Sequence, residues 1–102
     1  MKIFYIFLIL LGINTTADDF IVIDVRTPEE FKAGHIEDSS NVEWEIISSI
    51  IDEVKKDQQI YLYCRSGRRS KMATKLLKKK NFNVTNLEGG FIAWRKYFST
   101  KQ

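Results

Sequence analysis

The chain has 102 residues, of which 44% are hydrophobic and 28% charged, with five glycines and one proline. This composition is that of a single globular domain, and it excludes a disordered, collagen-like or multidomain protein. The formal net charge of +3 is small for this length and does not indicate a strongly basic nucleic-acid-binding surface.

The first 17 residues have the three parts of an export signal. Lys2 precedes an unbroken apolar run over residues 3–11, and the small residues Thr15 and Ala17 stand where a cleavage site needs them. A membrane-spanning helix needs about 20 apolar residues, so this run is too short. We therefore expect residues 1–17 to be a secretory signal peptide and residues 18–102 to form the domain, without a stable membrane anchor after cleavage. Export would place it in the periplasm of a bacterium with two membranes.

The first expected elements are a strand and a short helix. Residues 20–25 (FIVIDV) are β-branched and apolar on both faces, as in a strand buried within a parallel sheet. Thr27, Pro28 and Glu30 then form the pattern of a helix N-terminus with a capping box. Gly34 marks the end of this helix.

The rest of the chain continues to alternate strands with helices. Five further elements are expected in chain order: a short strand at residues 41–42, an amphipathic helix from residue 46 to about residue 57, a strand at residues 60–63, a helix that begins at about Ser70 and is ended by Asn81, and a strand at residues 84–87. After them Phe91, Trp94 and Phe98 share one face, which we expect to point into the core. The alternation predicts an α/β fold with a small, mostly parallel sheet and helices on both faces.

Cys64 is the only cysteine, so the chain can form no intramolecular disulfide. It directly follows the strand expected at residues 60–63, at the place where open parallel sheets bind their ligands. A free cysteine at the end of a strand is commonly an inert core residue, which is the alternative interpretation.

The loop after Cys64 favours the functional interpretation. Three of the next five residues are arginines, one is Gly67, which permits a sharp turn, and residues 58–87 contain no acidic residue. Positive charge and a helix N-terminus stabilise a thiolate, so we expect a nucleophilic cysteine with a lowered pKa. The same loop should attract a small anion.

Three motifs lie in order along the chain. They are Ile23-Asp24-Val25-Arg26-Thr27-Pro28-Glu29-Glu30-Phe31 with Gly34-His35-Ile36, then Cys64-Arg65-Ser66-Gly67-Arg68-Arg69, and finally Leu87-Glu88-Gly89-Gly90 with Ala93-Trp94. They resemble the D-V-R and G-H-I signature, the C-x-x-G-x-R loop and the L-x-G-G…A-W motif of single-domain rhodaneses, the thiosulfate sulfurtransferases. The resemblance covers nearly all of residues 18–102 and implies a three-layer rhodanese-like domain.

The resemblance also implies a reaction. Cys64 would attack the outer sulfur of thiosulfate, release sulfite and become a persulfide, which passes its sulfur to cyanide or a thiol acceptor. The implied substrate-binding loop consists of Arg65, Ser66, Gly67, Arg68 and Arg69. Asp24 and Arg26 would support the loop, and His35 would make a structural hydrogen bond.

No cofactor or metal is expected, because one cysteine and one histidine make a protein metal site improbable. We also expect a monomer that binds no nucleic acid. The lysines at positions 71, 75 and 78–80 are interpreted as a solvated helix face.

The sequence departs from the family pattern before the second strand. Asp38-Ser39-Ser40 precede Asn41, where the family usually has a small Gly-Ala pair, so the turn there is expected to differ. The extra strand and helix that larger rhodanese domains carry before the first strand are not evident.

Two alternative functions stay open. One is a persulfide carrier or partner-binding module without turnover. The other is a cysteine phosphatase or arsenate reductase, whose loops resemble C-x5-R. Here the sixth residue after Cys64 is Ser70 and the arginine comes one position earlier, at Arg69. Such a pocket would suit a single sulfur atom better than a tetrahedral phosphate.

Overall fold

The computed structural model describes residues 20–98 and 100–101, so the expected signal peptide lies outside the described residues. The elements are β1 (Phe20–Asp24), α2 (Pro28–Ala33), β2 (His35–Ile36), β3 (Ser40–Asn41), the 3-10 helix η1 (Trp44–Asp52), β4 (Gln59–Tyr63), α3 (Arg68–Lys79), β5 (Asn83–Asn86), α4 (Gly90–Trp94) and β6 (Thr100–Lys101). Within these described ranges, no helix is long and apolar enough to cross a membrane.

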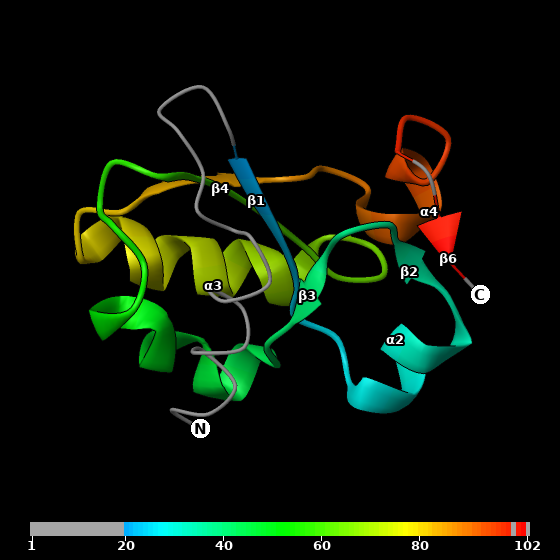
Figure 1. The fold of residues 1–102 in the computed structure, drawn as a ribbon, viewed down its shortest axis with the longest axis horizontal. Coiled ribbons are helices and arrows are strands. Elements are labelled where there is room, and N and C mark those ends of the chain that lie inside the picture. The colour runs from blue at the N-terminus through cyan, green and yellow to red at the C-terminus, as the bar shows by residue number, and fades with distance from the viewer. Residues whose placement is uncertain (1–19, 99, 102) are drawn as a thin grey trace.

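The main sheet has four strands in the order β3-β1-β4-β5, and all of its neighbouring strands are parallel. β2 and β6 form a separate antiparallel pair. In Figure 1, α3 and η1 lie together beside the sheet, whereas α2, β2, α4 and β6 gather at one end of the molecule. The predicted α/β fold with a small, mostly parallel sheet is confirmed.

Two apolar clusters lie on opposite faces of this sheet. The larger one packs alternate residues of β1 and β4, such as Ile23 and Leu62, against η1 and α3. The smaller one contains Val22 and Tyr63, with Phe91 and Trp94 of α4 packed against it. Because side chains alternate along a strand, the same two strands supply both clusters. This arrangement gives the expected three layers, and α4 points its aromatic residues inward as predicted.

Helix α2 begins with the capping box that the sequence predicts. Thr27 Oγ1 accepts a hydrogen bond from the Glu30 N–H at 3.2 Å, and Glu30 Oε1 accepts one from the Thr27 N–H at 3.0 Å. Pro28 occupies the start of the helix, and Gly34 ends it. These contacts lie within a few residues of each other, so the local sequence is enough to define them.

The helix expected from residue 46 to about residue 57 differs from the prediction. The structure has a 3-10 helix over Trp44–Asp52, with non-helical dihedral angles at Ile46. The segment is rich in isoleucine and serine, which are weaker α-helix formers than leucine or alanine. The Ser49 hydroxyl also donates to the Ile46 carbonyl, which competes with regular backbone bonding. The amphipathic pattern still buries Ile47 and Ile50.

Helix α3 begins two residues earlier than predicted, at Arg68 instead of about Ser70. The Lys71 N–H donates to the Gly67 carbonyl at 3.0 Å, which closes the first turn directly after the glycine. Asn81 follows the helix in a left-handed conformation with φ of 69°, in agreement with its predicted role. The loop between Cys64 and the helix is therefore only three residues long.

The turn with the unusual sequence is built around Asp38, which has a positive φ of 68°. Aspartate tolerates this conformation better than most residues, although glycine adopts it without cost. The following Ser39 is buried and donates to the Ile36 carbonyl at 2.6 Å. The departure from the family pattern is thus accommodated by local hydrogen bonding.

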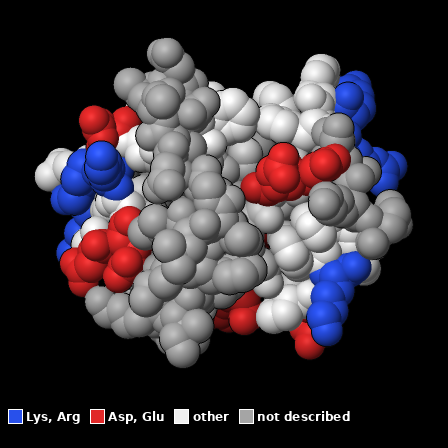
Figure 2. Space-filling view, in the orientation of Figure 1, with Lys and Arg blue, Asp and Glu red and all other residues white. Residues whose placement is uncertain are grey.

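The surface charges are mixed. On the face drawn in Figure 2, basic and acidic side chains alternate at the left edge, and an acidic group lies inside the right half with basic groups nearer the right edge, so the visible charges form no single extended patch of one sign. The absence of a nucleic-acid partner stays a prediction.

Candidate active site

Cys64 lies between the end of the central strand β4 and the loop that leads into α3. Its side chain is buried, with the residue only 1% exposed. The Gly67 N–H donates to Cys64 Sγ at 3.1 Å, and Ser70 Oγ lies 3.5 Å from the same sulfur. Gly67 has a positive φ of 109°, which turns the loop back over the sulfur. The short loop and the first turn of α3 therefore enclose the thiol on the helix side.

These contacts change the acidity of the thiol. Burial of Cys64 favours the neutral form, but hydrogen bonds from the Ser70 hydroxyl and from the backbone N–H groups of Ser70, Gly67 and Arg69 outweigh burial. Together they lower the pKa of Cys64 below its ordinary value. The expectation of an acidified cysteine from charge and helix position agrees with this direction, although hydrogen bonds are the larger favourable cause.

Helix α4 holds the other side of the loop through the Gly89-Gly90 turn. The Phe91 N–H donates to the Cys64 carbonyl at 2.8 Å. A Cβ atom at Gly90 would lie 2.5 Å from the Arg65 carbonyl oxygen and closer still to that of Cys64, so only glycine allows this approach. The L-E-G-G motif is thus a direct support of the cysteine loop.

Arg69 forms an ion pair with Glu30 of α2. Its two terminal nitrogens lie 3.0 Å and 3.1 Å from the two carboxylate oxygens, and both side chains are about one-third exposed. The hydrogen bond from Arg69 is the largest cause that lowers the pKa of Glu30 to about 2. The pKa of Arg69 is raised, first by Glu30 and also by the Cys64 side chain. Arg69 is therefore paired with Glu30 and also interacts electrostatically with the Cys64 side chain.

Asp24 and Arg26 form a second ion pair, which is buried. Arg26 donates from Nη2 to Asp24 Oδ2 at 2.7 Å and to the Gly34 carbonyl at 2.7 Å. Its guanidinium carbon also lies 4.6 Å from the centre of the Phe91 ring. Burial opposes the charge of Arg26, but the hydrogen bonds and charge of Asp24 outweigh it and raise the pKa of the guanidinium. The pair ties the end of β1 to the start of β2 and to α4.

The remaining predicted loop residues lie at the surface. The structure brings Cys64, Gly67 and Arg69 together. The side chains of Arg65, Ser66 and Arg68 are exposed to solvent instead. The substrate-binding assignment of all five loop residues stays a prediction. His35 contacts the Phe31 carbonyl through Nδ1 at 2.7 Å, which is the structural hydrogen bond expected of it.

Three residues that contact the cysteine loop or its neighbours were not identified by sequence reasoning as part of the site: Ser70, Asn86 and Glu30. The sequence indicates Ser70 as a helix start and as the residue that replaces the arginine of a C-x5-R loop, and it indicates Glu30 as a helix cap within the first motif, without a contact to the cysteine loop for either. Asn86 is a polar residue at the carboxyl end of the next strand, and that position is a signal that could have found it. Among the described residues, no group of three or more His, Cys, Asp or Glu side chains is arranged to hold a metal ion.

Comparison with family models matches residues 11–97 to the rhodanese-like domain. The chain belongs to the rhodanese-like family. It is 37% identical over 81 residues to a sulfurtransferase of Allochromatium vinosum, and the match covers 78% of this chain and 76% of that protein. It is also 33% identical over 85 residues to the thiosulfate sulfurtransferase GlpE of Pseudoalteromonas translucida, and this match covers 82% of this chain and 81% of that protein.

Solved structures agree with this assignment. The rhodanese-like domain of an Anabaena protein has a TM-score of 0.75 and 26% identity, and the match covers 82% of this chain and all of that one. The family resemblance inferred from three motifs is confirmed, and so is the three-layer fold. This rhodanese-like domain has sulfurtransferases among its homologues.

Proposed function

We propose that this rhodanese-like domain is a thiosulfate sulfurtransferase with Cys64 as its nucleophile. The observation that carries the proposal is the enclosure of Cys64 Sγ by the Gly67 N–H and the Ser70 hydroxyl at the N-terminus of α3. Donors placed in this way stabilise negative charge on the attacking thiolate. They would also stabilise the terminal sulfur of a persulfide.

The proposed reaction has two displacements. The Cys64 thiolate attacks the outer sulfur of thiosulfate, a sulfur–sulfur bond forms on the enzyme, and the bond to the sulfonate sulfur breaks to release sulfite. Cyanide or a thiolate then attacks the outer sulfur of the persulfide, which releases thiocyanate or a new persulfide and restores the Cys64 thiolate. No external oxidant or reductant is needed, and ping-pong kinetics are expected.

The arginines have separate parts in this proposal. Arg65 and Arg68 are exposed near the mouth of the loop, where positive charge attracts a small dianion. Arg69 is already paired with Glu30 and interacts electrostatically with the Cys64 side chain, so it acts on the thiolate as a positioned charge. Because Cys64 is only 1% exposed, side chains around the loop have to move when the donor enters.

The loop geometry favours sulfur transfer over phosphate ester hydrolysis. In a C-x5-R loop the sixth residue after the cysteine is the phosphate-binding arginine, whereas here that position is Ser70, a fully buried serine whose hydroxyl contacts the sulfur. An arginine at this position would need space that the described structure fills with Asn86 and the Gly67 carbonyl.

The direct test is the formation of thiocyanate from thiosulfate and cyanide by the purified protein. Cys64→Ala is the control, and the intact mass is measured after thiosulfate alone. We expect turnover that the variant loses, together with an added mass of one sulfur atom. If the protein shows no turnover and gains no mass, thiosulfate is excluded as the donor. Added mass without turnover would indicate a persulfide carrier.

A further inference from the structure

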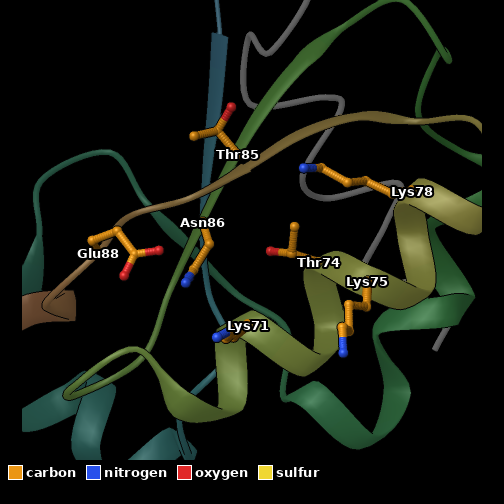
Figure 3. Close-up of a pocket in the computed structure, with 7 residues that line it drawn as sticks. All are labelled: Lys71, Thr74, Lys75, Lys78, Thr85, Asn86 and Glu88. Carbon is orange, nitrogen blue, oxygen red and sulfur yellow. The ribbon is translucent and has the colours of Figure 1, made fainter.

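Asn86 connects strand β5 to the sulfur of Cys64 through the Ser70 hydroxyl. Figure 3 shows Asn86 projecting toward the first turns of α3, beside Lys71. Its Oδ1 lies 2.5 Å from Ser70 Oγ, and Ser70 Oγ lies 3.5 Å from Cys64 Sγ. The three side chains form one hydrogen-bonded chain from the edge strand of the sheet to the thiol.

The hydroxyl of Ser70 has one proton and three possible acceptors. These are Asn86 Oδ1, the Gly67 carbonyl oxygen at 3.2 Å and Cys64 Sγ. Since a serine hydroxyl donates a single hydrogen bond, a proton given to Asn86 is withheld from the sulfur. The orientation of Ser70 therefore depends on the group that Asn86 presents to it.

Asn86 can present either a donor or an acceptor to Ser70. A rotation of the amide by about 180° exchanges Oδ1 and Nδ2. With Nδ2 facing Ser70, the amide donates to Oγ, and the hydroxyl proton becomes available to the sulfur. A hydrogen bond to a thiolate is charge-assisted and stronger than one to a neutral acceptor. The present contact of Nδ2, with the Gly67 carbonyl at 3.5 Å, is long, so it opposes the rotation only weakly.

We propose that Asn86 is a positioning residue for the nucleophile: its amide rotates as Cys64 ionises, so that Asn86 donates to Ser70 and Ser70 donates to the thiolate. This inference rests on the proposed role of Cys64. Asn86 does not touch the sulfur and acts only through Ser70. The Ser70 hydroxyl is the largest of the groups that lower the pKa of Cys64 against the effect of its burial, which gives this chain of contacts a measurable consequence.

Charged groups from three elements face these side chains. Arg69, Lys71, Lys75 and Lys78 come from α3, and Glu88 follows β5; all but Arg69 line the same groove as Asn86. Glu30 of α2 contributes through its ion pair with Arg69. All of these charged groups are unchanged in the variants below, so differences between variants report on Asn86 and Ser70.

The test compares Asn86→Asp with Asn86→Ala. An ionised aspartate keeps the shape of asparagine but only accepts hydrogen bonds, so Ser70 must donate to it and not to the sulfur. The pKa of Cys64 is read from the ultraviolet absorbance of its thiolate, with Cys64→Ser as the baseline, which is possible because Cys64 is the only cysteine. We expect Asn86→Asp to raise this pKa by about 1 to 2 pH units. Asn86→Ala leaves the Ser70 hydroxyl free to turn to the sulfur. This variant should change the pKa of Cys64 by less than half of the shift expected for Asn86→Asp.

The same two substitutions in a Ser70→Ala background separate hydrogen bonding from charge. Without the hydroxyl, Asn86→Asp acts on Cys64 only through its negative charge, so its pKa shift should fall to half or less. An equal shift in both backgrounds would overturn the proposal, because charge alone would explain it. An unchanged pKa of Cys64 in Asn86→Asp would also overturn the proposal, provided that urea unfolding shows this variant to be folded.

The absorbance measurement needs no sulfur donor. If wild-type protein fails to turn over thiosulfate, the proposed function fails while the comparison of pKa values still decides the role of Asn86. If turnover is present, the acid limb of its pH profile should move with the pKa of Cys64 in Asn86→Asp.

Discussion

The two arginine–carboxylate pairs near the cysteine loop have similar bonding and different surroundings. Arg26 and Asp24 have side chains 5% and 0% exposed, whereas Arg69 and Glu30 are 32% and 30% exposed. A buried charge without its partner is very costly, but an exposed charge can be solvated by water. The comparison indicates that the buried pair maintains the fold around the loop, while the exposed pair adjusts the charge beside the sulfur.

The largest effect is expected from breaking the buried pair. Arg26→Ala leaves the Asp24 carboxylate buried and without its guanidinium, and we expect a loss of about 3–5 kcal/mol in the free energy of unfolding. Urea unfolding measures this loss, with Arg95→Ala at an exposed arginine of the same protein as the control. A loss below about 1 kcal/mol would show that burial does not distinguish the two pairs.

Gly90→Ala tests the contact of α4 with the cysteine loop, which involves neither of the two arginine–carboxylate pairs. The new Cβ would meet the carbonyl oxygens of Cys64 and Arg65, and Gly90 has a φ of 59°, which L-residues rarely adopt. Together these effects should cost about 2–4 kcal/mol. Thermal unfolding gives the stability, and thiosulfate turnover of the folded fraction should fall sharply. Wild-type turnover with unchanged stability would mean that α4 does not position the loop.

A smaller effect is expected at the exposed pair. A double-mutant cycle with Glu30→Gln and Arg69→Gln should give a coupling energy of about 0.2–1 kcal/mol, and the bidentate geometry of the pair favours the upper end of this range. Four urea unfolding curves provide the measurement. A coupling as large as the loss expected for Arg26→Ala would remove the distinction drawn between the pairs.

The exposed pair should also give stability a dependence on pH. The pKa of Glu30 is lowered from 4.5 to about 2 in the folded protein, so the ionised carboxylate stabilises the fold fully above pH 4.5. This contribution is lost as the pH falls from 4.5 toward 2. The stability difference between the wild type and Glu30→Gln, measured by urea unfolding, should therefore shrink over that range. A difference that stays constant down to pH 3 would contradict the lowered pKa.

Much of the fold follows from local signals that the sequence carries. The capping box of Thr27 and Glu30, the apolar strands and the left-handed Asn81 all depend on residues close together in the chain. The predicted α-helix after residue 46 was wrong in type, because an apolar period of three to four residues fits a 3-10 segment almost as well. Periodicity located the buried face correctly without deciding the backbone geometry.

The sequence was enough to single out Cys64 as the proposed nucleophile, because strand, cysteine, glycine and arginines are consecutive. Its detailed environment was not, since the contacts that define it join distant segments. Glu30 meets Arg69 across 39 residues, and Ser70 meets Asn86 across 16. Glu30 looked fully used as a helix cap, and nothing local shows that its second oxygen faces an arginine of α3.

The amino-acid sequence was enough to predict the family, the order of strands and helices, and the cysteine that we propose as the nucleophile. Each of these depends on residue type and short spacing, which backbone geometry converts directly into local structure. The folded structure was needed to show which arginine is paired, which hydroxyl reaches the sulfur and which glycine lets α4 approach the loop. Those contacts arise where the packing of parallel strands brings the carboxyl ends of β1, β4 and β5 to one edge, and a linear pattern does not encode distances across that edge.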